Sequence, residues 1–369
     1  MPEIILQHVT KRFDKFVAVQ DLDLQIQDRG FITLLGPSGC GKTTTLRMIA
    51  GLETPTSGRI LIDGVPVFDS EKGINLPPNK RDIGFLFQNY ALWPHMTVYE
   101  NIAFGLEMLK WDKARIRRRV DELLALLKIE QFEKRYPAEL SGGQQQRVAI
   151  ARTLAPSPKV LFMDEPLSNL DAKLRQEMRT ELKRLHSDTN STFVYVTHDQ
   201  LEAMTLSTKV CLMDTGVLQQ YAPPLEIYGH PANLFVAEFV GNPTMNFIPA
   251  TVKAADGNRA SLSLLGHDAT FTAKAPLGEL TGSAVLGVRP EFLPIVQGGP
   301  LCGKTYSTLP AGMETTVKLS CGGTMLTSVV FGCVDYAVDT ELPLNIVGDN
   351  IALFDQASGQ SVGFGSVTF

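Results

Sequence analysis

Several features that mark secreted or membrane-spanning proteins are scarce in this sequence of 369 residues. No apolar run approaches the roughly 20 residues that cross a bilayer, and the first residues, MPEIILQHVT, lack the basic flank and long apolar core of a secretory signal. The five cysteines are odd in number and scattered, which argues against a disulfide framework and for a reducing compartment. We therefore expect a cytosolic protein that reaches a membrane only through partners.

A strong charge of either sign is also lacking. The formal net charge is −5, with 20% charged and 44% hydrophobic residues, so the composition is that of an ordinary globular protein and argues against a general nucleic-acid binder. Sustained heptads, the sign of long coiled-coil arms, are missing as well. A chain of this length can bury a large core and is expected to form two domains.

The glycine-rich stretch GPSGCGKTT at residues 36–44 organises the first half of the chain. It matches the P-loop pattern, in which glycines let backbone N–H groups turn inward around a phosphate chain. A following helix would aim its positive end at the same anion. A lysine suits the β- and γ-phosphates, and a threonine hydroxyl suits Mg²⁺. The predicted nucleotide-binding residues are Gly36, Pro37, Ser38, Gly39, Cys40 (most simply a bystander thiol), Gly41, Lys42, Thr43 and Thr44, with Thr43 also a metal ligand.

Four apolar runs have the character of strands buried in a parallel sheet: residues 31–35, 83–87, 160–163 and 193–196. Helical stretches separate them, which predicts an α/β layer with crossover connections. Residues 57–69 predict two strands around an Asp63-Gly64 turn. Residues 70–82, with two prolines, predict a loop.

Residues 97–139 change to helical spacing and predict a helical subdomain inserted in the α/β core. This segment carries a cluster of arginines, most simply a solvated helix face. A contact with a partner or with lipid headgroups is the alternative. The cluster consists of Arg115, Arg117, Arg118 and Arg119.

Polar residues follow three of the apolar runs, at the strand ends where open α/β sheets bind ligands. Asp164 and Glu165 follow residues 160–163, and we predict that Asp164 holds Mg²⁺ while Glu165 orients and polarises the attacking water. His198 is predicted to contact the γ-phosphate, and Gln88 to touch metal or water. The alternatives are two solvated acids at a strand end and a structural or surface histidine.

The segment LSGGQ at residues 140–144 predicts a second phosphate-facing helix start. Ser141 is a good N-cap, and the two glycines after it leave backbone N–H groups accessible. A monomer could hardly bring both this helix start and the P-loop to one nucleotide if they sit at opposite ends of the domain.

Together these motifs resemble the ATP-binding subunit of an ABC transporter of the maltose- and oligosaccharide-type carbohydrate importers. GPSGCGKTT is similar to Walker A, LSGGQ to the ABC signature, LFMDEP (161–166) to Walker B and SNLD (168–171) to the D-loop. Gln88 matches the Q-loop and His198 in YVTHD the switch histidine. Residues 70–76 are longer than the resemblance leads us to expect, and we interpret them as a surface insertion. The resemblance implies an α/β P-loop ATPase that binds ATP and Mg²⁺ and couples hydrolysis to transport.

The resemblance also implies a head-to-tail homodimer, in which the signature of one subunit clamps the ATP held by the P-loop of the other. It places Asp171 in the site, and puts Phe13 where adenine stacks. Phenylalanine keeps the stacking face of the usual tyrosine or tryptophan but loses the polar edge, so slightly weaker binding of the adenine ring is expected. From spacing alone, Phe13 is equally an ordinary core residue. The signature residues concerned are Ser141, Gly142, Gly143 and Gln144.

After residue 237 the chain turns to short alternating segments rich in Gly, Thr, Val and Leu, which predict small β-barrels or a sandwich. FVGNPTMNF (239–247) and GVRPE (287–291) resemble the regulatory domain of maltose-type importers, built from OB-like barrels. The predicted domains are therefore 1–237, an ATPase domain with its helical subdomain at about 89–158, and 238–369, a β-rich regulatory domain.

The resemblance implies two transmembrane permease subunits, an extracytoplasmic substrate-binding protein in the assembled complex, and a position at the cytoplasmic face of the cell membrane. It suggests a regulatory protein or small ligand at the C-terminal domain, and the acidic overall balance argues against nucleic acid as a partner. The expected cargo is an oligosaccharide or a sugar derivative such as glycerol-3-phosphate. The alternatives are polyamine, iron or sulfate import, or a soluble ABC ATPase that transports nothing.

Overall fold

The computed structural model describes residues 3–278, 280 and 282–369. The chain divides into two compact units, Met1–Pro224 and Leu225–Phe369.

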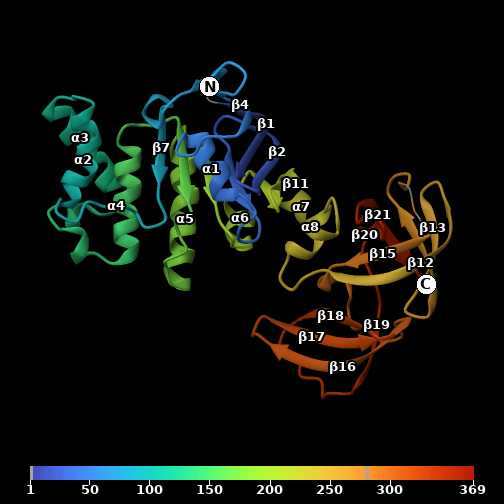
Figure 1. The fold of residues 1–369 in the computed structure, drawn as a ribbon. Helices are drawn as coiled ribbons and strands as arrows, with labels where there is room; N and C mark the ends of the chain where they lie inside the picture. Colours follow the sequence, from blue (N-terminus) through green and yellow to red (C-terminus); the bar gives the residue numbers. More distant parts are fainter. Residues whose placement is uncertain (1–2, 279, 281) are drawn as a thin grey trace. The chain divides into compact units, whose positions relative to one another are not determined.

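A six-stranded sheet of order β11-β10-β3-β9-β8-β7 forms the centre of the first unit (Figure 1). Neighbouring strands are parallel except for β11, which pairs antiparallel with β10. Every residue of β3, β8 and β9 is buried, as expected of strands covered on both faces. The predicted α/β fold is confirmed, and the four predicted runs lie side by side in it. The strands are β3 (Phe31–Leu35), β7 (Ile83–Leu86), β8 (Val160–Asp164), β9 (Thr192–Val196), β10 (Lys209–Asp214) and β11 (Val217–Ala222).

A second, antiparallel sheet of order β2-β1-β4-β5-β6 completes the strands of this unit. The predicted hairpin at residues 57–69 is present. Asp63 and Gly64 have φ of 53° and 74°, the left-handed pair that a tight two-residue turn needs. The strands are β1 (Ile4–Phe13), β2 (Phe16–Ile26), β4 (Ser57–Ile62), β5 (Val65–Asp69) and β6 (Ile74–Asn75).

Residues 70–82, predicted to form a loop, are mostly turn and irregular structure, and they also contain the two-residue strand β6 and the 3-10 turn η1 (Pro78–Lys80). The buried Arg81 side chain anchors them: it donates to the carbonyls of Met48 and Ile49 at 2.9 and 2.8 Å and to that of Leu76 at 2.8 Å. Two of these carbonyls belong to the last turn of α1 (Lys42–Ala50), where helices leave such groups unpaired. The loop is therefore held to α1 by contacts that the sequence did not predict.

Helices α2, α3 and α4 pack around one hydrophobic core and form the inserted helical subdomain (Figure 1). Asp112 begins α3 as its N-cap and accepts a hydrogen bond from the backbone N–H of Arg115 at 2.9 Å. Two 3-10 turns, η2 (Glu130–Phe132) and η3 (Pro137–Glu139), connect α3 to α4. The helices of this unit are α1, α2 (Val98–Met108), α3 (Lys113–Leu126), α4 (Gly142–Leu154), α5 (Ala172–Asp188) and α6 (Gln200–Leu206).

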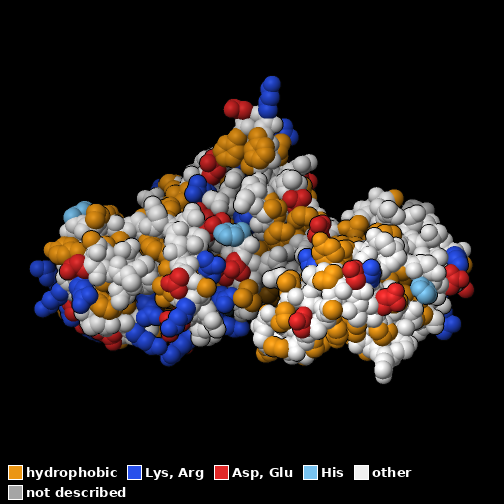
Figure 2. Space-filling model, turned by 90° about the horizontal axis from the view of Figure 1, so that it is seen from below, with side chains coloured by type: hydrophobic (Ala, Val, Ile, Leu, Met, Phe, Trp, Pro, Cys, Tyr) orange, Lys and Arg blue, Asp and Glu red, His pale blue; other side chains and the backbone are white. Residues whose placement is uncertain are grey.

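Lys and Arg side chains gather over the end of the first unit that carries α2 and α3 (Figure 2). Most arginines of the predicted cluster make contacts within the chain. Arg117 pairs with Asp121 and Glu133, Arg119 donates to the carbonyl of Leu154 at 3.0 Å, and Arg115 stacks over the ring of Trp111 at 3.5 Å. These contacts favour a structural role for the cluster.

The second unit combines a closed six-stranded barrel with a four-stranded sheet of order β18-β17-β16-β19. Both are antiparallel, and their inward-facing apolar residues share one core. The predicted β-rich OB-like domain is confirmed. The barrel strands are β12 (Asn246–Asp256), β13 (Arg259–Leu264), β14 (His267–Ala273), β15 (Ser283–Val288), β20 (Ile351–Asp355) and β21 (Ser361–Thr368); the sheet contains β16 (Leu301–Pro310), β17 (Glu314–Cys321), β18 (Thr324–Phe331) and β19 (Glu341–Leu344).

Two short helices, α7 (Pro224–Gly229) and α8 (Leu234–Phe239), precede the barrel. The predicted domain boundary at 237/238 falls within α8, whereas the compact units meet at Pro224. The physical reason is Arg289, which is buried in the second unit, ahead of the 3-10 turn η4 (Pro290–Phe292). Its guanidinium donates to the carbonyls of Tyr228 at 2.8 Å and of Val240, and so ties both helices to the barrel.

No helix in the described part of the chain is both long and apolar enough to cross a membrane.

Candidate active site

The stretch of residues 36–44, called the P-loop below, runs from the end of β3 into the first turn of α1 and encloses the Lys42 side chain. Lys42 is only 5% exposed, and its ammonium group donates to the carbonyls of Gly36 and Pro37 at 2.7 and 2.8 Å. Gly41 has a φ of 101°, and a Cβ atom there would lie 2.4 Å from the carbonyl oxygen of Ala18. The structure therefore places a buried cation and a helix N-terminus at one compact loop, an arrangement suited to phosphate.

Thr43 and Asp164 form the contact between this loop and the sheet. The Thr43 hydroxyl donates to Asp164 Oδ1 at 2.9 Å, and Arg47 Nη2 lies 3.4 Å from Asp164 Oδ2. Asp164 is the last residue of β8 and is only 5% exposed. A hydroxyl and a carboxylate this close are the hard oxygen donors that Mg²⁺ prefers, so the residues present fit that ion.

Three predicted catalytic residues meet at one carboxylate oxygen. His198 Nδ1 lies 3.3 Å from Glu165 Oε2, and Gln88 Nε2 lies 3.5 Å from the same oxygen. Gln88 also donates to Ser168 Oγ at 3.2 Å. Glu165 has a φ of 46°, a conformation that is uncommon outside glycine and clusters at functional sites. With 24% of the Glu165 side chain and 58% of the His198 side chain exposed, the cluster is open to solvent.

The signature residues and Asp171 cap helices in the structure. The Ser141 N–H donates to Gln144 Oε1 at 2.9 Å, and Asp171 accepts from the backbone N–H of Leu174 at 3.0 Å as the N-cap of α5. Gly142 and Gly143 are the first two residues of α4. Within the described residues, no hydrogen bond or ion pair joins these positions to the loop of residues 36–44. Their contact with nucleotide stays a prediction.

Phe13 lies at the tip of the β1–β2 hairpin with 43% of its surface exposed, so it is not an ordinary core residue. Lys11 Nζ lies 4.6 Å from the centroid of its ring. The same hairpin contributes Ala18, whose carbonyl lies against Gly41 of the P-loop. Stacking of adenine on Phe13 stays a prediction.

Sequence reasoning missed Tyr90 and Arg152. Tyr90 is buried, and its hydroxyl donates to the carbonyl of Pro166 at 3.3 Å. Arg152 donates to the carbonyls of Tyr90 and Ala91. The one local signal for Arg152 is a cation within the apolar helix segment VAIARTL, and it does not reveal the partners.

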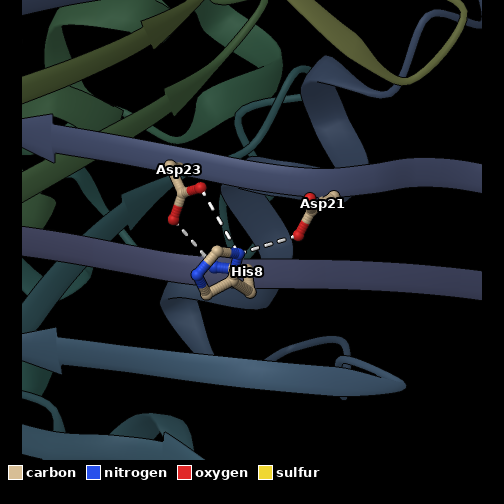
Figure 3. Close-up of side chains that lie close together, drawn as sticks. All are labelled: His8, Asp21 and Asp23. Carbon is tan, nitrogen blue, oxygen red and sulfur yellow. Dashed lines mark hydrogen bonds and ion pairs between the residues drawn. The ribbon is translucent and has the colours of Figure 1, made fainter.

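His8, Asp21 and Asp23 form a separate cluster on the antiparallel sheet (Figure 3). His8 Nδ1 lies 3.0 Å from Asp21 Oδ1 and 3.5 Å from Asp23 Oδ2, and all three residues are exposed. The hydrogen bond to Asp21 and the charges of both carboxylates raise the pKa of His8. A protonated imidazole between two carboxylates accounts for this cluster without a metal ion.

Two family models match the chain: "ABC transporter" over residues 19–168 and "MalK OB fold domain" over residues 241–293. The trehalose/maltose import ATP-binding protein MalK of Thermococcus litoralis is 50% identical over 296 residues, which cover 79% of each chain. The spermidine/putrescine import ATP-binding protein PotA of Roseobacter denitrificans is 50% identical over 289 residues, covering 78% of this chain and 77% of that protein.

A similar solved structure is the dimeric post-hydrolysis state of the ATP-binding cassette MJ0796 bound to ADP and Pi. It has a TM-score of 0.52 and 33% sequence identity, and the likeness covers 60% of this chain and 98% of that one.

Proposed function

The chain belongs to the ATP-binding subunits of ABC transporters, ATPases that couple ATP hydrolysis to transport, and on this premise we propose that it powers the import of a carbohydrate through two membrane-embedded permease subunits. The observation that carries the proposal is the meeting of Gln88, Glu165 and His198 at the sheet edge that the P-loop also contacts.

The chemistry follows from the positions of these side chains. Lys42 exchanges its loop carbonyls for the β- and γ-phosphates of ATP. Thr43 and Asp164 would hold Mg²⁺, with Gln88 near it, and the ion supplies charge neutralisation for the phosphates when bound. Glu165 takes a proton from a water whose oxygen attacks the γ-phosphorus, the β–γ bridging bond breaks, and ADP and phosphate result. His198 holds the Glu165 carboxylate on one side and contacts the γ-phosphate.

The chain is proposed to act as a head-to-tail homodimer at the cytoplasmic face of the membrane. Ser141, Gly142, Gly143 and Gln144 of one subunit then cover the ATP on the P-loop of the other, with Asp171 nearby. Two observations support this arrangement: the α4 N-terminus is a phosphate-suited helix start with no bond to its own P-loop among the described residues, and the similar cassette MJ0796 is dimeric with ADP and Pi bound.

A carbohydrate is the preferred cargo because residues 241–293 match the MalK OB fold model and the chain as a whole is similar to the MalK relative. A polyamine is the second candidate, because the PotA relative has the same sequence identity. Cargo choice resides in the permease and binding-protein subunits, and the second unit is proposed to bind a regulatory protein or small ligand.

The test is to pull the tagged full-length chain from its own membranes and identify the proteins that co-purify. We expect two multi-span permease subunits and a sugar-binding protein, with ATP hydrolysis by the recovered complex stimulated by that protein loaded with sugar. A polyamine-binding protein in its place would replace carbohydrate with the second candidate. Recovery of ribosomes or DNA-repair factors instead of permeases would overturn the transport function.

A further inference from the structure

We propose that Arg152 is a positioning residue for hydrolysis. It holds residues 88–91 beside the Glu165 carboxylate of the same chain, and it thereby couples movement of α4 to the position of that carboxylate. The inference rests on the proposed function, because α4 meets a nucleotide only in the head-to-tail dimer. It adds a link between the two ATP sites that the motifs themselves do not contain.

Arg152 lies in the last turn of α4. Both terminal nitrogens of its guanidinium group donate hydrogen bonds to the backbone shortly after Gln88. Nη1 donates to the carbonyl of Ala91 at 2.6 Å, and Nη2 donates to that of Tyr90 at 2.7 Å. The guanidinium carbon also lies 4.7 Å from the ring centroid of Trp93. Two hydrogen bonds from one planar group, with a ring below it, fix the orientation of this short segment.

The segment that Arg152 holds has an uncommon backbone. Tyr90 and Ala91 are consecutive non-glycine residues with φ of 60° and 47°. Such conformations persist only where the surroundings hold them, and they cluster at functional sites. The two carbonyls bonded to Arg152 belong to these same two residues, so its guanidinium is one of the contacts that hold them.

From this segment, contacts run to both sides of Glu165. The buried ring of Tyr90 reaches Pro166, the residue after Glu165, through a hydrogen bond of 3.3 Å to its carbonyl. Asn169 Nδ2 donates to the carbonyl of Gln88 at 3.1 Å, and the Gln88 amide lies 3.5 Å from Glu165 Oε2. A shift of residues 90 and 91 therefore moves the Gln88 amide and the Pro166 backbone, which flank the Glu165 carboxylate.

The other end of α4 carries Ser141 to Gln144. The helix has 13 residues, a rod of about 20 Å, and its buried face packs in the core of the helical subdomain. Displacement of one end therefore displaces the other. In the proposed dimer the first turn of α4 touches the nucleotide on the partner's P-loop, so Glu165 of one chain responds through Arg152 to the nucleotide bound mainly by the other.

The test uses mixed dimers with only one working carboxylate. Two differently tagged full-length chains are co-expressed and purified through both tags, one carrying Glu165→Gln and the other an intact Glu165. Arg152→Gln is then placed either on the chain with the intact Glu165 or on its partner. We expect about a tenfold or larger loss of kcat in the first case and nearly full activity in the second.

Each other outcome overturns the inference. Loss only when Arg152→Gln lies on the partner would mean that the residue acts through the signature on the opposite ATP. Equal loss in both dimers would indicate a general folding defect, and no loss in either would exclude a positioning role. A dimer that cannot be formed even from unsubstituted chains would count against the proposed head-to-tail function itself, which keeps the two failures distinct.

Homodimers supply the matched controls. Arg152→Gln should lower kcat while leaving the KM for ATP within about twofold. Arg152→Lys keeps the positive charge but cannot donate to both carbonyls in the same geometry, so it should recover part of the lost kcat. Arg147→Gln is the control on the same helix, because Arg147 donates to the carbonyl of Leu127, away from Gln88. It should behave like the unsubstituted chain. A KM that rises with unchanged kcat in Arg152→Gln would contradict the proposal.

Discussion

The Thr43 hydroxyl donates a 2.9 Å hydrogen bond to the Asp164 carboxylate across 121 positions of sequence. This bond joins the first turn of α1 to the end of β8. It brings two oxygen ligands suited to Mg²⁺ to one point at the P-loop.

Thr43→Ala should lower magnesium-dependent ATP hydrolysis by about tenfold or more, because the proposed oxygen ligand of Mg²⁺ and its bond to Asp164 are lost. Thr43→Ser keeps the hydroxyl and should retain most activity. The measurement is phosphate release over a magnesium titration, beside ATP binding in EDTA, which should change little in both variants. Equal losses in the alanine and serine variants would contradict a ligand role for the hydroxyl.

Two glycines of the P-loop should differ in their tolerance of alanine. Both have positive φ, 81° at Gly39 and 101° at Gly41, which costs an alanine about 1–2 kcal/mol in either place. A Cβ atom on Gly39 meets nothing within 4 Å, whereas on Gly41 it would lie 2.4 Å from the Ala18 carbonyl oxygen. Equilibrium titration with a fluorescent ATP analogue should show a far larger loss of affinity for Gly41→Ala. Similar losses would mean that the backbone conformation alone decides.

Glu165→Gln should bind ATP and close the dimer but release phosphate about 10²–10⁴-fold more slowly, because an amide cannot accept the proton of the attacking water. Single-turnover phosphate release and ATP-dependent dimerisation by gel filtration measure the two properties separately. Glu177→Gln, on the exposed side of α5, is the control and should turn over normally. Undiminished release from Glu165→Gln would exclude this residue as the base.

Arg81→Met should destabilise the first unit by about 2–4 kcal/mol, because the carbonyls of Met48, Ile49 and Leu76 each lose the hydrogen bond from the buried guanidinium group. Arg81→Lys keeps the positive charge but not the planar set of guanidinium donors. Its free energy of unfolding should therefore lie between those of the unsubstituted chain and Arg81→Met. Urea unfolding followed by a probe in the first unit gives the free energy, since a chain of two units need not unfold in one step. A midpoint that does not move in Arg81→Met would show that the segment folds without this anchor.

The cluster of His8, Asp21 and Asp23 should make stability depend on pH. Because the pKa of His8 is raised above its usual 6.5 in the native state, chiefly by the hydrogen bond to Asp21, the protonated imidazole stabilises the fold. This contribution is complete below pH 6.5 and disappears as pH rises through the raised pKa. NMR titration of the His8 ring should give a lower pKa in Asp21→Asn, and a smaller decrease in Asp23→Asn. An unchanged pKa in Asp21→Asn would mean that the pair does not form in solution.

Much of the site could be predicted because its signals are local. The P-loop glycines, the helix cap at Ser141 and the apolar runs of buried strands each depend on residues within a few positions of one another. Conformational freedom at glycine, capping by short polar side chains and the period of burial all act over that distance. The contacts that could not be predicted join distant segments, as in the bonds from Arg81 to Met48 and from Arg152 to Tyr90.

The sequence by itself determined the α/β class, the order of the motifs and which residues are candidates for phosphate and carboxylate chemistry. Only the tertiary structure decided that the strands assemble as β3-β9-β8-β7, which brings Gln88, Glu165 and His198 to one carboxylate oxygen. It alone revealed that Arg152 and Tyr90 connect α4 to that oxygen. The reason is physical: a local pattern reports how a segment folds, whereas the pairing of segments far apart depends on packing that no local pattern records.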